Sequence, residues 1–143
     1  MAVRHMTAEF LKDYFKATKN FDKTLQKVKI LNIAKGNCLA ELKLEEEHTN
    51  SLGGLHGGFS STLVDVISSY GLISHEKCDN RPLSVSVDLH VTFLKPAKLG
   101  DEILIDTKTN RVGKNLAFCE VEILNKETKE LLVKGTHTKF IFS

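Results

Sequence analysis

The chain has 143 residues, of which 41% are hydrophobic and 27% are charged, and its formal net charge is +2. These are ordinary values for a globular protein, and they exclude a disordered, collagen-like or membrane-spanning chain. The small net charge, without a dense run of Lys and Arg, excludes the basic footprint of a nucleic-acid-binding surface. We therefore expect a single domain over residues 1–143, with one hydrophobic core and a helical segment at residues 1–20.

The cysteines and the sequence signals for secretion indicate the cellular compartment of the protein. Cys38, Cys78 and Cys119 are odd in number and widely spaced, without a CxxC pair, so we expect reduced thiols rather than disulfides or a zinc site. The sequence contains no Asn-x-Ser/Thr acceptor, and its N-terminus lacks the apolar stretch of a signal peptide. These features predict an intracellular, cytoplasmic protein.

The first residues also carry a competing signal. Arg4, Lys12 and Lys16 fit a mitochondrial presequence, whereas Glu9 and Asp13 interrupt the basic pattern that such sequences keep. A mitochondrial location therefore stays open beside the cytoplasmic one.

An amphipathic helix is predicted over residues 7–19, because apolar side chains recur there at helical spacing and Thr7 is a suitable N-cap. We expect it to pack on the domain or on a partner subunit rather than on a membrane, since its polar face carries both signs of charge. Two strands at residues 24–34 and 38–44 follow, joined into a hairpin by a turn at Gly36-Asn37.

A second helix, predicted over residues 58–77, is almost free of charge. From Phe59 to Ser74 its single formally charged residue is Asp65. The other residues are apolar, small or hydroxyl-bearing, which is typical of a helix that is buried on most sides. Another part of the fold must therefore surround it.

The C-terminal half predicts a sheet that can do so. Residues 83–93 alternate apolar and polar side chains without a break, which indicates a long half-buried strand. Further strands are predicted at residues 103–111, 117–123 and 131–142. Because short turns and no helical crossover connect these strands, the sheet should be antiparallel. One buried helix with a sheet curled around it is an α+β fold.

A glycine-rich segment, residues 48–58, comes immediately before the second helix. The first N–H groups of a helix have no intrahelical acceptor and lie at the positive end of its dipole, so they can stabilise a developing oxyanion. The Gly57 N–H is our candidate donor, and a flexible connection is the structural alternative. Asn50 and His56 in this segment can contact a substrate, brace the loop or cap the helix.

Asp65 requires an explanation, because a carboxylate on a buried helix costs stability unless it is paired or has a task. It can serve as a general base for a hydrolytic water or as a nucleophile. On the strand at residues 83–93, Ser86 can orient such a water or simply be solvated. We expect no metal, since the histidines lack metal-ligand spacing, and no serine nucleophile, since no GxSxG elbow is present. The structural alternative for Asp65 is a hydrogen bond to a neighbouring hydroxyl, of Ser61, Thr62, Ser68 or Ser69.

Gly57 and Asp65 are eight residues apart in the sequence, which places them roughly 12 Å apart along one helix. Both therefore cannot contact a single scissile carbonyl. If both act in one reaction, a second copy of the chain must bring its Asp65 to the Gly57 of the first, as a two-fold dimer does twice. The sequence thus predicts a composite site between two subunits.

Four motifs carry a resemblance to a known family: HTNSLGGLHGG, the TLVD that contains Asp65, SVSVDLHVTFLKPAKLGD, and GKNLAF. In this order, and over nearly the whole chain, they resemble the PaaI-like branch of the hotdog-fold thioesterases. The resemblance implies a hotdog fold with a long central helix inside a curved sheet, in a tetramer built as a dimer of dimers. It also implies hydrolysis of medium- to long-chain fatty acyl-CoA to fatty acid and CoA, with no cofactor, since coenzyme A is part of the substrate.

The same resemblance assigns roles to individual residues. Asp65 is the general base or nucleophile, and the Gly57 N–H polarises the thioester carbonyl. Asn50 and His56 match groups that position the thioester, and Ser86 matches a serine that orients the water. The resemblance further implies contacts with the substrate or its CoA at Ser86, Phe93, Arg111, Val112, Gly113, Lys114, Asn115 and Leu116.

Other functions compete with this one. The same scaffold serves thioesterases for aryl-CoA or short acyl groups, and a non-catalytic acyl-CoA sensor or carrier would use the same pocket. A hotdog dehydratase is disfavoured because its Asp/His pattern has no match. A lipid-binding protein partner is expected from family analogy alone. Residues 78–81 and 140–143 depart from the family pattern, so CoA contacts near them can differ.

Overall fold

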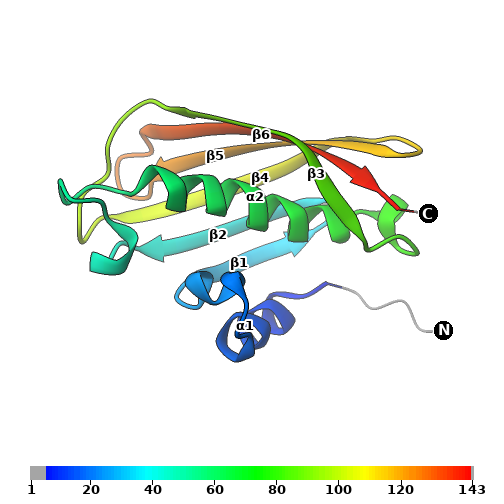
Figure 1. Ribbon diagram of the computed structural model, residues 1–143, viewed down its shortest axis with the longest axis horizontal. Coiled ribbons are helices and arrows are strands. Elements are labelled where there is room, and N and C mark those ends of the chain that lie inside the picture. Colours follow the sequence, from blue (N-terminus) through cyan, green and yellow to red (C-terminus); the bar gives the residue numbers. More distant parts are fainter. Residues whose placement is uncertain (1–5, 143) are drawn as a thin grey trace.

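The structure, a computed structural model, describes residues 6–142. Within these residues the chain forms two α-helices, three short 3-10 helices and one six-stranded sheet (Figure 1). Neither α-helix of this described part is long and apolar enough to cross a membrane. In chain order the elements are α1 (Ala8–Ala17), η1 (Phe21–Leu25), β1 (Lys29–Ala34), β2 (Asn37–Lys43), η2 (Glu46–His48), α2 (Gly57–Ile73), η3 (Glu76–Cys78), β3 (Ser84–Phe93), β4 (Glu102–Val112), β5 (Leu116–Asn125) and β6 (Leu131–Ile141).

The six strands lie in the order β1-β2-β4-β5-β6-β3, and every neighbouring pair is antiparallel. β1 and β2 form the predicted hairpin, and α2 runs along one face of the sheet (Figure 1). The predicted α+β fold, with an antiparallel sheet around one central helix, is confirmed. β3 pairs with β6 rather than with β4, the strand that follows it in the sequence.

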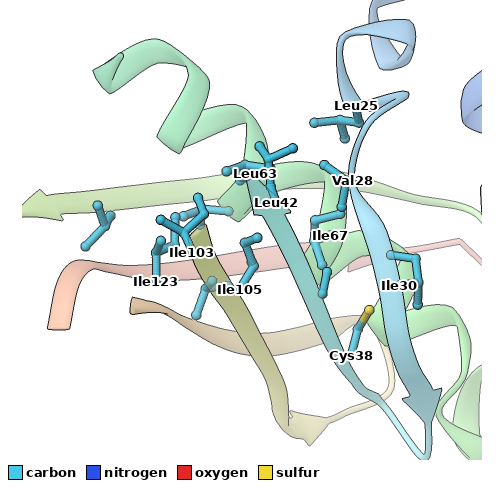
Figure 2. Close-up of a cluster of buried hydrophobic side chains, with 14 of the residues drawn as sticks. Leu25, Val28, Ile30, Cys38, Leu42, Leu63, Ile67, Ile103, Ile105 and Ile123 are labelled. Atoms are coloured by element: carbon cyan, nitrogen blue, oxygen red, sulfur yellow. The ribbon is translucent and has the colours of Figure 1, made fainter. Parts of the chain in front are cut away.

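α2 supplies the centre of the hydrophobic core. Leu63, Val64 and Ile67 are fully buried, at spacings that place them on one side of the helix. The inward-facing residues of the sheet cover this side, because side chains of a strand alternate between its two faces. Figure 2 shows Leu63 and Ile67 among the buried side chains of the neighbouring strands, including Leu42, Ile103 and Ile105.

A glycine on β6 sets how closely α2 approaches the sheet. A methyl group at Gly135 would lie 2.6 Å from Cγ1 and 2.9 Å from Cγ2 of Val64. Both distances are well inside van der Waals contact, so the helix would have to move. On the helix side, a methyl group at Gly71 would lie 3.0 Å from Thr107 Oγ1. α2 can lie this close to the sheet because Gly135 and Gly71 have no side chain.

The N-terminal helix packs on the domain, as predicted. Thr7 Oγ1 accepts a hydrogen bond from Phe10 N at 3.0 Å, which confirms the predicted N-cap. Leu11 and Phe15 are buried in the main core, and α1 lies beside β1 (Figure 1). Residues 1–5 of the predicted helical segment lie outside the described residues.

The predicted strand at residues 24–34 is wrong in its first half. η1 occupies Phe21–Leu25, and β1 begins only at Lys29. The side chain of Asn20 accepts a hydrogen bond from Asp22 N at 2.9 Å and caps the 3-10 turn, while Leu25 reaches the core from it. A local cap, which the apolar pattern does not reveal, therefore decides the conformation here.

α2 ends at Ile73, earlier than the predicted end near residue 77. The hydroxyl of Ser74 accepts a hydrogen bond from Gly36 N at 2.9 Å, which ties the end of the helix to the β1–β2 turn. That turn uses Lys35 and Gly36, with φ of 55° and 87°, rather than Gly36 and Asn37. The helix thus ends at its last apolar residue, Ile73, and its C-cap Ser74 contacts the turn.

β3 is at the edge of the sheet, and its apolar side chains are uncovered in the single chain. Val85 is 50% exposed and Val87 is 60% exposed. The prediction of a half-buried strand is therefore not met within one chain. An edge strand that presents apolar side chains and unpaired backbone groups is a surface at which another chain can pair.

The contact between Gly135 and Val64 predicts the effect of one methyl group. Gly135→Ala should lower the free energy of unfolding by about 1–3 kcal/mol, because overpacking forces the helix away from the sheet. Urea unfolding followed by circular dichroism measures this loss.

Two further variants isolate the cause. Thr136→Ser, at the exposed neighbouring residue of β6, should change stability by less than about 0.5 kcal/mol. Adding Val64→Ala removes both methyl groups that the new side chain meets, so the double variant should cost less than the sum of the single changes. Strict additivity would show that Val64 is not the contact that limits residue 135.

Candidate active site

The glycine-rich segment before α2 is held in place at several points. His48 is buried, its Nδ1 accepts a hydrogen bond from Glu45 N at 3.0 Å, and its backbone oxygen accepts His56 N at 2.9 Å. Further along, Leu55 N donates to Ala97 O at 2.9 Å. The segment is thus an ordered loop fixed by neighbouring elements, not the flexible connection that its glycine content left open.

His56 is the N-cap of α2. Its Nδ1 accepts hydrogen bonds from Gly58 N at 2.9 Å and from Phe59 N at 3.4 Å. The N–H of Gly57, the first residue of the helix, has no hydrogen-bond acceptor within residues 6–142. Because Nδ1 is an acceptor, a neutral His56 ring carries its proton on Nε2, which can donate to a ligand. The capping role weighed for His56 is confirmed, and it leaves Gly57 as a free amide at the positive end of the helix.

Asn50, Gly57 and Phe93 line the same cleft, which has a volume of about 330 Å³. A methyl group at Gly57 would lie 3.4 Å from the Phe93 ring, so this ring flanks the free amide. Asn50 Oδ1 accepts hydrogen bonds from Leu52 N at 2.9 Å and Gly54 N at 3.2 Å, and so braces the loop. In the described part of the chain Asn50 Nδ2 has no acceptor and remains available to a ligand.

The Asp65 carboxylate has no hydrogen bond to the hydroxyl groups around it. Its side chain is 44% exposed in the single chain, on the part of α2 that the sheet does not cover. The four neighbouring hydroxyls all donate to backbone oxygens of the helix: Ser61 to Gly57, Thr62 to Gly58, Ser68 to Val64, and Ser69 to Asp65 itself. The structural alternative for Asp65, a hydrogen bond to one of these hydroxyls, is therefore not observed.

A buried histidine lies between Asp65 and Ser86. His137 on β6 is fully buried, with Nδ1 2.8 Å from Ser68 Oγ and Nε2 2.7 Å from Ser86 Oγ. Burial lowers the pKa of His137 to about 4, the charge of Lys139 adds to this, and the carboxylates of Asp65 and Asp88 oppose it. His137 is thus neutral at pH 7, and its Nε2, 3.8 Å from Asp65 Oδ1, forms no ion pair there.

The hydrogen bonds of His137 have a defined direction. Ser68 donates its proton to Val64 O at 2.6 Å, so its oxygen must accept from Nδ1–H of His137. Nε2 of the neutral ring is then an acceptor, and Ser86 donates to it. The lone pairs of Ser86 therefore remain free to accept a hydrogen bond from a water, which fits its predicted orienting role.

A β-bulge accompanies this contact. The register between β3 and β6 shifts between Ser86, opposite Lys139, and Asp88, opposite Thr138. The extra residue, Val87, bends the strand locally, and bulges of this kind redirect neighbouring side chains. The bulge lies at the point where Ser86 reaches His137 on the adjacent strand.

A buried lysine lies next to the histidine. Lys139 is only 6% exposed, and its Nζ donates to Ser69 Oγ at 2.6 Å. Burial lowers the pKa of Lys139, while Asp65 and Cys119 raise it. Neither His137 nor Lys139 was predicted from the sequence. Their signal in the sequence is that His137 and Lys139 lie on the same inward face of β6 as Val133 and Gly135, where apolar residues are usual.

The predicted CoA-binding turn lies at the β4–β5 connection. Arg111, Val112, Gly113 and Lys114 line a cleft of about 680 Å³ there. The Val112 side chain faces a small core cluster and is buried, so only its backbone is available to a ligand. Asn115 and Leu116 accept backbone hydrogen bonds, from Ile141 N and Gly113 N respectively, each at 2.7 Å. These two residues hold the turn rather than line the cleft.

Comparison with known proteins gives matches over most of the chain. Residues 52–132 match the sequence profile of the Thioesterase superfamily. Acyl-coenzyme A thioesterase 13 of Homo sapiens is 44% identical over 133 residues, which are 93% of this chain and 92% of that protein. The crystal structure of zebra fish thioesterase superfamily member 2 has a TM-score of 0.87 and 39% identity, covering 94% of this chain and 97% of its own. A hypothetical thioesterase from Streptococcus pneumoniae, solved with coenzyme A, has a TM-score of 0.76 at 25% identity and covers 85% of this chain and 90% of its own.

The buried, neutral His137 predicts a loss of stability in acid. Its pKa falls from 6.5 to about 4 on folding, so the unfolded chain binds more protons between these values and stability drops as the pH decreases through them. The loss amounts to about 3 kcal/mol for this one group, at 1.36 kcal/mol per pKa unit. Between pH 6.5 and 4, the unfolding free energy of His137→Gln should therefore fall by about 3 kcal/mol less than that of wild type.

Urea unfolding at a series of pH values measures the difference. His90→Gln, at an exposed histidine of β3, serves as the control and should retain the wild-type pH dependence. Equal slopes for His137→Gln and wild type would contradict a buried, neutral imidazole.

Proposed function

The chain belongs to the Thioesterase superfamily and has its hotdog fold, and on this basis we propose that it hydrolyses medium- to long-chain fatty acyl-CoA to fatty acid and CoA. One observation carries the proposal. The Gly57 N–H and the Asp65 carboxylate, on the same helix, are both left without a hydrogen-bonding partner within residues 6–142. An unpaired donor and an unpaired base are what hydrolysis of a thioester requires.

The geometry supports a sequence of steps. The thioester oxygen accepts a hydrogen bond from Gly57 N–H, with the Asn50 amide as a second donor, and the carbonyl carbon becomes more electrophilic. A water held by Ser86 gives one proton to Asp65 as its oxygen attacks that carbon. The tetrahedral intermediate then collapses, the C–S bond breaks, and the Asp65 carboxyl returns the proton to the departing CoA thiolate. Direct attack by Asp65, through a mixed anhydride that water cleaves, is the alternative route.

The two halves of this site must come from different subunits. Gly57 and Asp65 are both on α2, roughly 12 Å apart along its axis at about 1.5 Å per residue. The uncovered edge of β3, with Val85 and Val87 exposed, offers a surface for a second copy. A two-fold pair joined there brings Asp65 of each subunit towards Gly57 of the other. A dimer of two such pairs gives the proposed tetramer.

The acyl group has an apolar surface available near the loop. A second cleft, of about 350 Å³, contains His56 together with Phe21, Phe59 and Thr62. Its aromatic walls suit an aliphatic chain, and they also suit an aryl group, so acyl-chain length is a matter for experiment. The named activity of the human relative, an acyl-coenzyme A thioesterase, favours a CoA thioester as the substrate.

Replacement of the base tests the chemistry. Asp65→Asn should lower kcat/KM for CoA release by at least about 100-fold, because the amide cannot take the proton of the water. A free-thiol assay with acetyl-, octanoyl-, palmitoyl- and phenylacetyl-CoA measures this loss and ranks the acyl groups in the same experiment.

Asp13→Asn, at an exposed aspartate of α1, should keep wild-type rates. Equal rates for Asp65→Asn and wild type would exclude the mechanism. If wild type binds acyl-CoA tightly and releases no thiol, the chain is a sensor or carrier. A clear preference for phenylacetyl- or acetyl-CoA would reassign it to the aryl- or short-chain thioesterases.

Mixed subunits test whether the site is composite. Gly57→Pro removes the amide hydrogen at the first helical residue, a position that tolerates proline, and should abolish activity, whereas Gly57→Ala keeps the hydrogen. Asp65→Asn and Gly57→Pro chains, inactive alone, should regain about a quarter of wild-type activity when mixed one to one. Half of the random dimers are then mixed, and each of these has one intact site out of two.

Gly57→Ala should be clearly more active than Gly57→Pro. This result would show that activity needs the amide hydrogen of residue 57, and not merely the absence of a side chain there. If mixing restores no activity although the chains exchange, as shown by a tagged subunit, the two groups act within one chain or not together.

A further inference from the structure

The segment that connects α2 to β3 packs against the β4–β5 turn. It contains η3, in which Cys78 is buried in the small core cluster with Val112. The backbone then turns back, with Arg81 N donating to Cys78 O at 3.0 Å. Residues 78–81 are the segment that the sequence resemblance marks as a departure from the family pattern. In the structure they bring Arg81 next to the predicted CoA-binding turn.

The Arg81 guanidinium joins the two segments. Nη1 donates to Lys114 O, and Nη2 lies 3.5 Å from Gly113 O, both in the turn. On the other side, Nη2 and Nε donate to Lys77 O at 3.0 Å and 3.3 Å. The partners of this charge are thus backbone oxygens, and within residues 6–142 it has no carboxylate within ion-pair distance.

Arg81 is not needed to close the turn. Gly113 N already donates to Leu116 O, and Ile141 N to Asn115 O, each at 2.7 Å. What Arg81 adds is orientation: it binds the carbonyl oxygens of residues 113 and 114, which would otherwise repel an anion in the adjacent cleft. A cation bonded to these oxygens also makes the local potential more positive.

The cleft of about 680 Å³ between η3 and the turn is suited to an anion. Lys77 from η3 and Arg111 and Lys114 from the turn line it, against a single carboxylate, Glu76. Arginine and lysine side chains on two facing walls are the usual means of binding phosphate groups. The cleft is at the other end of α2 from Gly57, beside its last turn, so it is separate from the proposed thioester site.

We propose that the α2–β3 connection completes the site for the phosphorylated nucleotide of CoA, with Lys77 contacting phosphate and Arg81 acting as a positioning residue that holds the turn of residues 113–114. This inference rests on the proposed function for the identity of the ligand. It makes the connection a determinant of CoA binding and gives it no part in the hydrolytic step.

Substrates with and without the nucleotide of CoA distinguish a role of Arg81 in nucleotide binding from a general role in stabilising the fold. Arg81→Ala should raise KM for octanoyl-CoA about tenfold, as expected for loss of a charged hydrogen-bond network, with kcat unchanged. For octanoyl-pantetheine, which lacks the nucleotide and its phosphates, kcat and KM should both stay at the wild-type values. Arg81→Lys should restore the KM only in part, because an ammonium group lacks the planar fork that reaches both segments.

Lys77→Gln provides a second, independent variant, since the Lys77 side chain makes no hydrogen bond or ion pair with the part of the chain that the structure describes. It should raise KM for octanoyl-CoA and reduce the dependence of that KM on salt. Lys12→Gln, at an exposed residue of α1, should do neither. If Arg81→Ala fails to fold, Lys77→Gln and Arg81→Lys still decide the matter.

Two results would overturn the inference: an unchanged KM for octanoyl-CoA in both Arg81→Ala and Lys77→Gln, or equal effects on octanoyl-CoA and octanoyl-pantetheine. If wild type hydrolyses neither substrate, the proposed function fails. Calorimetric titration of wild type and Lys77→Gln with CoA then tests the site alone. Weaker CoA binding by the variant supports the inference, and equal binding overturns it.

Discussion

The contact between α2 and β6 is the constraint on which the rest of the structure depends. The methyl groups of Val64 fill the space beside Gly135 that a side chain would occupy. This close packing fixes the distance between the helix and the sheet. At that depth Ser68 meets His137. Asp65, one residue after Val64, is then turned towards the uncovered side. The absence of a side chain at Gly135 thus determines which residues of α2 are buried, and it leaves the Asp65 carboxylate on the uncovered side.

From this contact a set of hydrogen bonds passes from the helix to the edge of the sheet. The proton of Ser68 is fixed by Val64 O, which fixes the ring proton of His137, which in turn fixes the proton of Ser86. Burial keeps the imidazole neutral, so it transmits an orientation without adding a charge next to Asp65. Ser86 can therefore accept a hydrogen bond from a water near Asp65, as the proposed mechanism requires.

Much of the fold follows from periodicity, because alternation in the last three strands and the uncharged run around Asp65 are direct signs of burial. Asp65 is evident as the one charge in that run, and Gly57 from its place at the start of the predicted helix. His137 and Lys139 were missed because their meaning depends on the register that places β6 beside β3. The strand predicted from residue 24 is wrong because the Asn20 cap is a local hydrogen bond. The surroundings of β3 could not be predicted, since one chain does not contain what covers it.

The cap on α2 also determines which kind of ligand this helix can receive. A helix N-terminus is ordinarily a phosphate site, because several free amides converge on it. Here His56 Nδ1 occupies the amides of residues 58 and 59, and His48 O occupies that of residue 56. One donor is left, which satisfies the single oxygen of a carbonyl and offers little to a phosphate with three. Under the proposed function, the cap of His56 would make this end of α2 a better binding site for the thioester carbonyl than for the phosphate groups of CoA.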